Sequence, residues 1–417
     1  MTAKVISIAE APGVYPNLYL EDQTIRKPKN LLDGCLLTKE LIFKEKLGAG
    51  SFGLIYLVEN LHTGRLYAAK ILLMNPPTSS AGSRDVREYK KYIQAKIFDY
   101  FSVHSETRIK SLDEEYIAAL AQTNDVFKEI HLHLKVHEHP NVITIHDILE
   151  VDDFAVVTLM DYYEQGDLYH SIVDQNIFLN IPERQEREKL MKNAILQIIE
   201  AVTYCHSKGL FHCDLKPENI LVKYSHQRAK AKDSPTVDLS QIHLVLIDFG
   251  LAMEDSKIRS NVCRGSSFYM PPERLSNFDD PTIISMLNSS YSSNDTVSAT
   301  ESFTGSSSAD YNQNVKCAKD YKFSPTAGGD VWSIGVLCLN IACARNPWPI
   351  ARFNEKKNDV YSTFMLHNSN VLALILPISS SFNSVLKKVF TLDPDRRISI
   401  TKLRVAIRNC MALTISH

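Results

Sequence analysis

Residues 212–219 read His-Cys-Asp-Leu-Lys-Pro-Glu-Asn, and Asp248-Phe249-Gly250 follows further along the chain. The octet sets a carboxylate, an ammonium group and an amide at fixed intervals. Phosphoryl transfer needs a carboxylate that accepts a proton from the attacking hydroxyl, a cation near the transferring phosphate, and oxygen ligands for Mg²⁺. The residue types therefore predict Asp214 as the base, Lys216 as the cation, and Asn219 with Asp248 as the metal ligands.

A glycine-rich segment, Leu47-Gly48-Ala49-Gly50-Ser51-Phe52-Gly53, lies upstream between two apolar runs. A G-x-G-x-x-G pattern alone is weak evidence, because many hairpins use glycine where a positive φ is needed. Here the segment lies between predicted strands and does not open a helix. This position argues against a dinucleotide-binding fold and favours a hairpin over the phosphates of ATP.

Together these motifs resemble those of eukaryotic protein kinases. The octet resembles the catalytic loop H-R-D-L-x-x-x-N, Asp248–Gly250 resembles the metal-binding motif, and Tyr67-Ala68-Ala69-Lys70 resembles the V-A-I-K strand. Residues 265–273 resemble the end of an activation segment, G-T-x-x-Y-x-A-P-E. The Lys-Pro-Glu-Asn form of the loop is typical of serine/threonine kinases. The His-Cys-Asp, Tyr-Met-Pro-Pro-Glu and Leu-Pro-Ile-Ser strings are most like those of fungal kinases that govern meiosis and nutrient response.

The resemblance implies an α+β, bilobal protein kinase fold. The N-lobe is expected to hold a small antiparallel β-sheet and one helix, and the C-lobe to be larger and mainly helical. One insertion is rich in serine, a composition that cannot bury enough apolar area to offset chain entropy, so we expect a disordered loop that binds regulators. The expected parts are an N-terminal arm (1–40), a kinase domain (41–409, with lobes 41–161 and 162–409), insertions at about 75–122, 223–241 and 276–325 (the serine-rich one), and a tail (410–417).

The resemblance also assigns the functional residues. Lys70 needs a carboxylate on a helix, and Glu129 is expected to supply it because it lies ten residues before His139-Pro140-Asn141. Glu273 is expected to pair with Arg397, and Asp330 to hold the backbone of the catalytic loop. The expected catalytic residues are Asp214, Lys216, Lys70 and Glu129; the ATP-binding residues are Leu47, Gly48, Gly50, Ser51, Gly53, Ile55, Ala68, Lys70, Met160, Asp161, Tyr163, Asp167, Leu221 and Asp248; the Mg²⁺ ligands are Asn219 and Asp248.

Two further features bear on regulation and substrate choice. Cys213 occupies the position where most kinases have the arginine that pairs with a phosphorylated activation loop. We therefore hypothesise that activity does not depend on phosphorylation of that loop. Asp167 and Glu218 match positions that, in basophilic kinases, face an arginine upstream of the acceptor, so the resemblance implies a preference for basic residues upstream of the acceptor. The alternative is that Asp167 binds only the ribose of ATP.

Composition narrows the class of protein further. The 417 residues carry a formal net charge of −2, which provides no general attraction to nucleic acid or to an anionic membrane. The eight cysteines include no C-x-x-C pair, and the N-terminus lacks a basic segment followed by an apolar run. We expect a monomeric cytoplasmic or nuclear enzyme that acts on protein substrates. The alternative is a pseudokinase that serves as a binding platform, and the presence of Lys70, Glu129, Asp214, Asn219 and Asp248 argues against it.

Overall fold

The computed structural model of the chain describes residues 32–49, 53–76, 86–104, 107–227, 236–254, 266–275, 285, 327–353 and 359–415. Most of the predicted N-terminal arm and of the serine-rich insertion, and residues 255–265 of the activation segment, lie outside this part. The chain divides into two compact units. The smaller unit comprises the described residues up to Glu138 together with Ile143–Glu164, and the larger unit comprises His139–Val142 and the described residues from Gln165 onward.

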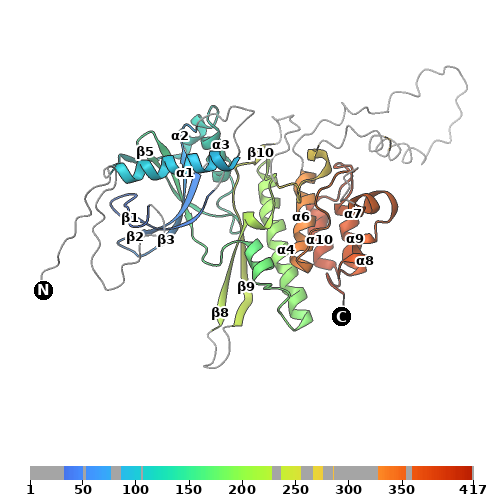
Figure 1. Cartoon of the computed structure of the whole chain (residues 1–417). Helices are drawn as coiled ribbons and strands as arrows, with labels where there is room; N and C mark the ends of the chain where they lie inside the picture. Colours follow the sequence, from blue (N-terminus) through green and yellow to red (C-terminus); the bar gives the residue numbers. More distant parts are fainter. Residues whose placement is uncertain are drawn as a thin grey trace, which may run out of the picture. The chain divides into compact units, whose positions relative to one another are not determined.

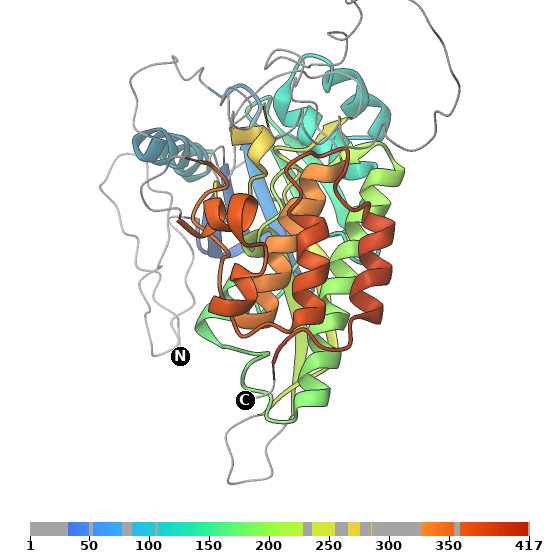
Figure 2. The same cartoon turned by 90° about the vertical axis from the view of Figure 1, so that its right-hand side faces the viewer.

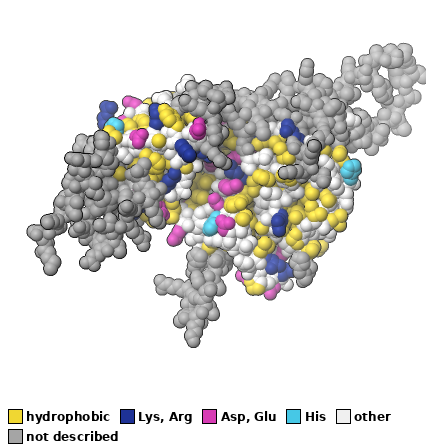
Figure 3. Space-filling model, in the orientation of Figure 1, with side chains coloured by type: hydrophobic (Ala, Val, Ile, Leu, Met, Phe, Trp, Pro, Cys, Tyr) yellow, Lys and Arg dark blue, Asp and Glu magenta, His cyan; other side chains and the backbone are white. Residues whose placement is uncertain are grey.

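Surface chemistry agrees with the near-neutral composition. On the face drawn in Figure 3, charged side chains of both signs are interspersed with apolar ones. Within the described residues, no helix combines the length and the apolar character that crossing a membrane requires.

An antiparallel six-stranded sheet, ordered β1-β2-β3-β6-β5-β4, forms the framework of the smaller unit (Figure 1). Every neighbouring pair of strands is antiparallel. The structure therefore has the antiparallel N-lobe sheet that the resemblance implies. Its strands are β1 (Leu41–Ala49), β2 (Gly53–Asn60), β3 (Leu66–Leu73), β4 (Ile109–Ser111), β5 (Ile145–Val151) and β6 (Ala155–Asp161), and its helices are α1 (Val86–Val103), α2 (Glu114–Leu120) and α3 (Asp125–Leu134).

Helix α1, which lies within the predicted insertion at 75–122, covers one face of this sheet (Figure 1). Ile93, Ile97 and Phe101 recur at intervals of four and form one apolar stripe on the helix. They join a core with strand residues such as Phe43 and Tyr56, and the rings of Phe43 and Phe101 meet edge to face at 5.5 Å. The amphipathic stretches Tyr89–Phe101 and Glu114–Ala121 predict one or two helices in this insertion, and the structure confirms both. The unit thus holds α1 and α2 in addition to α3, the single helix that the family resemblance implies.

The larger unit is mainly helical. Figures 1 and 2 show α4, α6, α9 and α10 side by side, and these helices pack against one another. The elements are η1 (His170–Asp174), α4 (Arg184–Ser207), β7 (Leu210–Phe211), η2 (Pro217–Asn219), β8 (Ile220–Gln227), β9 (Thr236–Leu246), β10 (Met253–Glu254), η3 (Pro272–Leu275), α6 (Ala327–Cys343), α7 (Asp359–Ser362), η5 (Thr363–His367), α8 (Val371–Ile375), α9 (Ser380–Val389) and α10 (Ile400–Asn409).

The segment that starts Asp330-Val331-Trp332-Ser333-Ile334-Gly335-Val336 is apolar nearly all round, which predicts a central buried helix. The structure confirms this, since helix α6 is buried on all sides from Asp330 to Cys343. Gly335 lets α9 approach closely, since a Cβ at this position would lie 2.4 Å from Cγ1 of Val389. Trp332 on the same helix is fully buried and contacts Phe390 edge to face. The helix therefore forms a rigid support on which Asp330 is carried into the unit.

Strands β8 and β9 pair in a long antiparallel hairpin that takes in both ends of the predicted insertion at 223–241. The ladder continues outward through Gln227 and Thr236, so much of that stretch is strand. Residues 228–235 lie outside the described part of the chain. The hairpin delivers the two motif residues at its inner ends: Asn219 precedes β8, and Asp248 follows β9.

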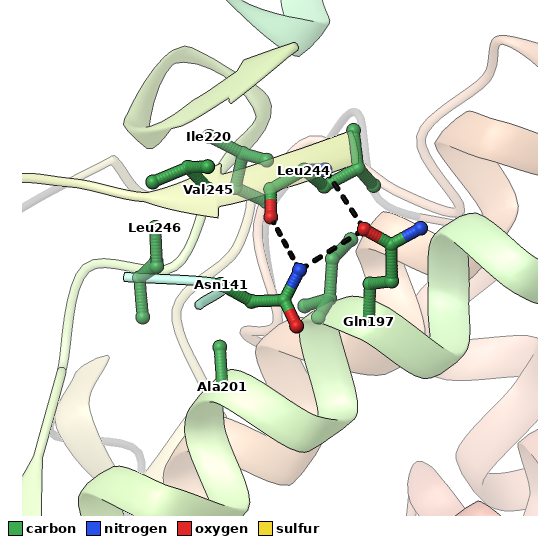
Figure 4. Close-up of a pocket in the computed structure, with 8 residues that line it drawn as sticks. Asn141, Gln197, Ala201, Ile220, Leu244, Val245 and Leu246 are labelled. Carbon is green, nitrogen blue, oxygen red and sulfur yellow. Dashed lines mark hydrogen bonds between the residues drawn. The ribbon is translucent and has the colours of Figure 1, made fainter. Parts of the chain in front are cut away.

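Asn141 ties β9 to α4 in a small pocket (Figure 4). Its Nδ2 donates to the carbonyl of Leu244 at 2.8 Å and to Oε1 of Gln197 at 3.0 Å. The same Gln197 oxygen accepts the amide hydrogen of Leu244 at 2.9 Å, and the amide of Leu246 donates to the Asn141 carbonyl. Because β9 runs directly into Asp248, these bonds fix the starting point of the metal-binding motif.

Candidate active site

The glycine-rich hairpin connects β1 to β2 in the smaller unit. Leu47 and Gly48 lie on β1 and Gly53 begins β2, whereas Gly50 and Ser51 lie outside the described residues. A Cβ at Gly53 would lie 2.0 Å from the carbonyl oxygen of Ile71. Glycine is therefore required at this position so that β2 can approach β3.

Lys70 and Glu129 form an ion pair in the smaller unit. Lys70 lies on β3 and Glu129 on α3, and both side chains are largely buried. Asn124 caps α3 by accepting the amide hydrogen of Val126, and its Nδ2 donates to the carbonyl of Met74 just after β3. These bonds hold the start of α3 against the end of β3, and they therefore fix the position of Glu129 on the helix relative to Lys70 on the strand.

Four of the expected ATP-binding residues lie on one face of the sheet. Ile55 pairs directly with Lys70, and Ala68 pairs directly with Met160. Directly paired residues in an antiparallel ladder share a face, and residues two apart on a strand do so as well. The opposite face carries Tyr56, Ile71 and Val157, which pack with α1. Ile55, Ala68, Lys70 and Met160 therefore lie on the face that α1 leaves uncovered.

Asp161 and Tyr163 follow β6. Asp161 pairs with Tyr67, and its carboxylate lies 2.7 Å from Nε2 of His146, so its side chain belongs to the other face of the sheet. A contact from Asp161 to the nucleotide would have to come from its main chain. Burial, aided by the charge of Asp161, raises the pKa of Tyr163 to about 12, so its hydroxyl stays protonated at neutral pH.

Asp330 holds the backbone at the start of the catalytic loop in the larger unit. Oδ2 accepts the amide hydrogen of His212 and Oδ1 that of Cys213, both at 2.9 Å, which confirms the expected role of Asp330. Complete burial alone would raise the pKa of this carboxyl, but its contacts with His206, His212 and the Cys213 amide hold the pKa below its ordinary value. The loop therefore rests on an ionised, fully bonded carboxylate.

Lys216 and Asn219, the other two polar groups of the predicted site in the octet, contact the Asp214 carboxylate. Lys216 Nζ lies 2.6 Å from Oδ2, and Nδ2 of Asn219 donates to the same oxygen at 3.0 Å and to the Asp214 carbonyl at 2.8 Å. The amide of Ser266 makes a long contact with Oδ1, at 3.4 Å. Since both contacts of the Asn219 nitrogen are with acceptors, the amide orientation is determined and its oxygen is directed elsewhere.

A main-chain hydrogen bond connects the segment that carries Asp248 to Asn219. The Ile247 amide donates to the Asn219 carbonyl at 2.9 Å, and the Ile247 carbonyl lies 3.0 Å from Nε2 of His212. Asp248 has a φ of 65° and an exposed side chain, whereas the next residue, Phe249, is buried against His212. The carboxylate of Asp248 and the amide oxygen of Asn219 are the kinds of oxygen ligand that Mg²⁺ prefers, and the main-chain bond brings the segments that carry them together.

Asp167 and Leu221 meet at an isolated bridge between the start of the larger unit and β8. The amide of Val222 donates to the Gly166 carbonyl at 3.0 Å, and Oδ1 of Asp167 accepts the amide hydrogen of His170 at 2.8 Å. These bonds place Asp167 and Leu221 in the same unit as the catalytic loop. One carboxylate oxygen of Asp167 is used in capping the turn at His170.

The end of the activation segment is anchored by a buried ion pair. Arg397 donates to both carboxylate oxygens of Glu273, at 2.8 and 3.0 Å, and neither side chain is more than 4% exposed. This pair confirms the expectation drawn from the family pattern. The hydroxyl of Ser333 donates to the carbonyl of Tyr269 at 2.8 Å and so fixes the same segment to α6.

Sequence reasoning missed one residue at this site. Arg274 follows Glu273, is buried, and donates from Nη1 to the main-chain carbonyl of Cys213 in the catalytic loop. Two features of the sequence could have indicated its role: Arg274 directly follows the activation-segment motif, and the catalytic loop has Cys213 in place of the usual arginine.

The predicted residues thus form two groups, each assembled within one unit. Lys70 and Glu129, with Ile55, Ala68 and Met160 on the same face of the sheet, belong to the smaller unit. The larger unit holds Asp167, Asp214, Lys216, Asn219, Leu221 and Asp248.

Comparison with known proteins gives the family. The family model described as "Protein kinase domain" matches residues 95–286. The chain is 32% identical over 394 residues to serine/threonine-protein kinase VHS1 of Saccharomyces cerevisiae, covering 92% of this chain and 73% of that protein. It is 29% identical over 396 residues to serine/threonine-protein kinase SKS1 of the same yeast, with 92% and 67% covered.

A third relative comes from fission yeast. The chain is 30% identical over 401 residues to the "Negative regulator of sexual conjugation and meiosis" of Schizosaccharomyces pombe, covering 94% of this chain and 64% of that protein. These matches extend over nearly the whole chain, and they agree with the sheet, the ion pairs and the catalytic loop described above. The chain belongs to the protein kinase family and is a serine/threonine protein kinase.

Proposed function

We propose that this enzyme transfers the γ-phosphate of ATP to serine and threonine hydroxyls of protein substrates in a Mg²⁺-dependent reaction. The observation that carries the proposal is the arrangement around Asp214. One oxygen of its carboxylate contacts Lys216 and Asn219, and the other, among the residues that the structure describes, has the 3.4 Å contact from the Ser266 amide as its one hydrogen bond. Oδ1 is therefore the atom best able to accept the proton of an incoming hydroxyl.

The chain's other polar groups would then serve the phosphates. Lys216 carries a positive charge 2.6 Å from the Asp214 carboxylate, and the Lys70 ammonium, held by Glu129, would contact the nucleotide phosphates. The oxygens of Asn219 and Asp248 would hold Mg²⁺, which when bound neutralises charge on the phosphates. Ile55, Ala68 and Met160 present an apolar surface suited to the adenine ring.

We further propose that the enzyme is active without phosphate on its activation loop. The support is Cys213, whose neutral side chain offers no partner to a phosphate, and whose thiol pKa is raised by burial and by the Asp330 charge. Among the serines of that segment, Ser256 and Ser260 lie outside the described residues. A strict requirement for a phosphate on Ser256, Ser260, Ser266 or Ser267 would contradict the proposal.

A preference for basic residues upstream of the acceptor is also proposed. Glu218 is exposed beside the catalytic loop, and Asp167 has one carboxylate oxygen beyond the one that caps His170. Two carboxylates of this kind hold a guanidinium through charge-assisted bonds. A degenerate peptide library that shows no enrichment of upstream arginine would exclude this preference.

The decisive experiment is Mg-ATP phosphorylation of a degenerate Ser/Thr/Tyr peptide library by the purified, phosphatase-treated chain. We expect phosphate on serine and threonine, and none from the Asp214→Asn variant. If the wild-type chain binds nucleotide but labels no acceptor, a binding platform would replace the proposed enzyme.

A further inference from the structure

Arg274 connects the end of the activation segment to the catalytic loop through a contact that uses no phosphate. We propose that Arg274 is a positioning residue: its guanidinium holds the Cys213 peptide, and through it the Asp214 carboxylate, in the conformation needed for phosphotransfer. This inference rests on the function proposed above and adds the means by which the loop is held in the absence of the usual arginine.

The Cys213 peptide needs such support because of its backbone conformation. Cys213 has a φ of 64°, in the left-handed region that residues other than glycine seldom adopt. Conformations of this kind persist only where the surrounding structure determines them from several sides. Asp330 takes the amide hydrogens of His212 and Cys213, and Arg274 donates to the Cys213 carbonyl. The main chain that leads into Asp214 is thus held through the amide hydrogens of His212 and Cys213 and through the Cys213 carbonyl.

Arg274 itself is carried on a fixed platform. Its amide donates to the Pro271 carbonyl at 3.0 Å in the short helix η3. The residue before it, Glu273, is locked by Arg397, and Tyr269 is bonded to Ser333 on α6. A long side chain held at its base by this network can fix the position of a loop, whereas one on a mobile segment could not.

The charges around Cys213 explain why an arginine suits this place. Burial raises the pKa of the Cys213 thiol, the charges of Asp330 and Asp214 raise it further, and the charge of Arg274 lowers it. Two carboxylates and a buried guanidinium therefore act on the same side chain, and a buried charge is stable only when paired and hydrogen-bonded. Arg274, Cys213, Asp214 and Ser266 also line one small cavity, of about 10 Å³, so these groups converge on one point.

The variants Arg274→Met and Arg274→Lys test this role. Methionine keeps most of the aliphatic volume and removes every donor, whereas lysine keeps the charge and loses the planar fork. The matched control is Arg352→Met, because Arg352 also donates to a main-chain carbonyl, that of Leu275 at 3.3 Å, and this carbonyl is within the same segment, whereas the bond of Arg274 is to Cys213 in the catalytic loop.

We expect kcat to fall by about 10-fold to 100-fold in Arg274→Met, the size typical of a misplaced catalytic group, and by less in Arg274→Lys. The KM for ATP should stay within about twofold of wild type, because the substitution displaces a catalytic group and leaves the nucleotide-binding contacts in place. Arg352→Met should match wild type in both constants. Unchanged kcat in a folded Arg274→Met variant would overturn the inference.

A second measurement does not depend on activity. Amide hydrogen exchange in the peptide that covers His212–Leu215 should be at least about tenfold faster in Arg274→Met than in wild type, and unchanged in Arg352→Met. Equal exchange in all three proteins would refute the positioning role, even if the wild type phosphorylates no peptide. A wild-type chain without activity would instead refute the proposed function, and the exchange rates would still decide the role of Arg274.

Discussion

Replacing Asp330 with asparagine should weaken the larger unit and impair catalysis together. The substitution keeps the size of the side chain but removes its charge and turns one acceptor oxygen into an NH₂ donor. In the wild type Oδ2 accepts from His212 and lies 2.9 Å from His206 Nε2, and Oδ1 accepts from Cys213. In either amide orientation at least one buried main-chain N–H faces the new donor and loses its partner.

The expected loss of stability follows from the number of main-chain N–H groups that lose their acceptor. Leaving one buried donor unsatisfied costs about 1–3 kcal/mol, and bonds to a charged acceptor contribute more than neutral ones. We therefore expect the free energy of unfolding of this unit to fall by about 2–4 kcal/mol. Because the Cys213 conformation depends on the same carboxylate, kcat should fall by about 10-fold or more.

Tryptophan fluorescence reports this unit specifically. The chain has two tryptophans, Trp332 and Trp348, and both are buried in the larger unit. Urea unfolding followed at these residues gives the loss of stability. Asn340→Asp is the matched control, since Asn340 is buried on the same helix and donates to the Arg345 carbonyl at 2.9 Å. It should lower stability and leave kcat unchanged.

The pH dependence provides a further check. The pKa of Asp330 is lowered in the folded protein, so its stabilisation is fully present above the pKa of an unfolded aspartate, about 4, and is lost as the pH falls through the lower folded value. The difference between wild type and Asp330→Asn should therefore be complete at pH 7 and shrink below about pH 4. A variant as stable as wild type at pH 7, or one with normal kcat, would refute the reasoning.

Three other substitutions or treatments test the remaining contacts. Lys70→Met should reduce kcat/KM by about 100-fold or more by removing the cation held by Glu129, whereas Lys44→Met, which breaks the surface pair with Glu59 at 2.8 Å, should leave steady-state kinetics unchanged. Glu273→Gln should lower the unfolding free energy, followed by tryptophan fluorescence, by about 3–5 kcal/mol because the buried Arg397 charge loses its partner; a loss below about 1 kcal/mol would contradict this. Burial raises the pKa of the Cys213 thiol. Iodoacetamide at pH 8 should therefore label this thiol at least about tenfold more slowly in the folded chain than in urea, as measured by mass spectrometry. Equal labelling rates would show an accessible thiolate and contradict this prediction.

Much of the fold could be predicted because its signals are local. The helical spacing of Met191, Ile195, Ile198 and Val202 predicts the apolar stripe of α4, and Gly209, which has a φ of 69°, predicts where the helix ends. The all-round apolar segment from Asp330 likewise indicated a central buried helix. The position of α1 was beyond such reasoning, because an amphipathic helix in an insertion does not specify which apolar face it covers.

The sequence by itself determined which residues carry the chemistry. Asp214, Lys216 and Asn219 lie within one short loop, so their spacing alone brings them together, and Glu129 and Arg397 were identified from the family pattern. The tertiary structure alone decided that α1 closes one face of the sheet and that Arg274 reaches the Cys213 carbonyl. Both depend on which distant surfaces meet, and a buried cation finds its partners only when the helices and loops around it are assembled.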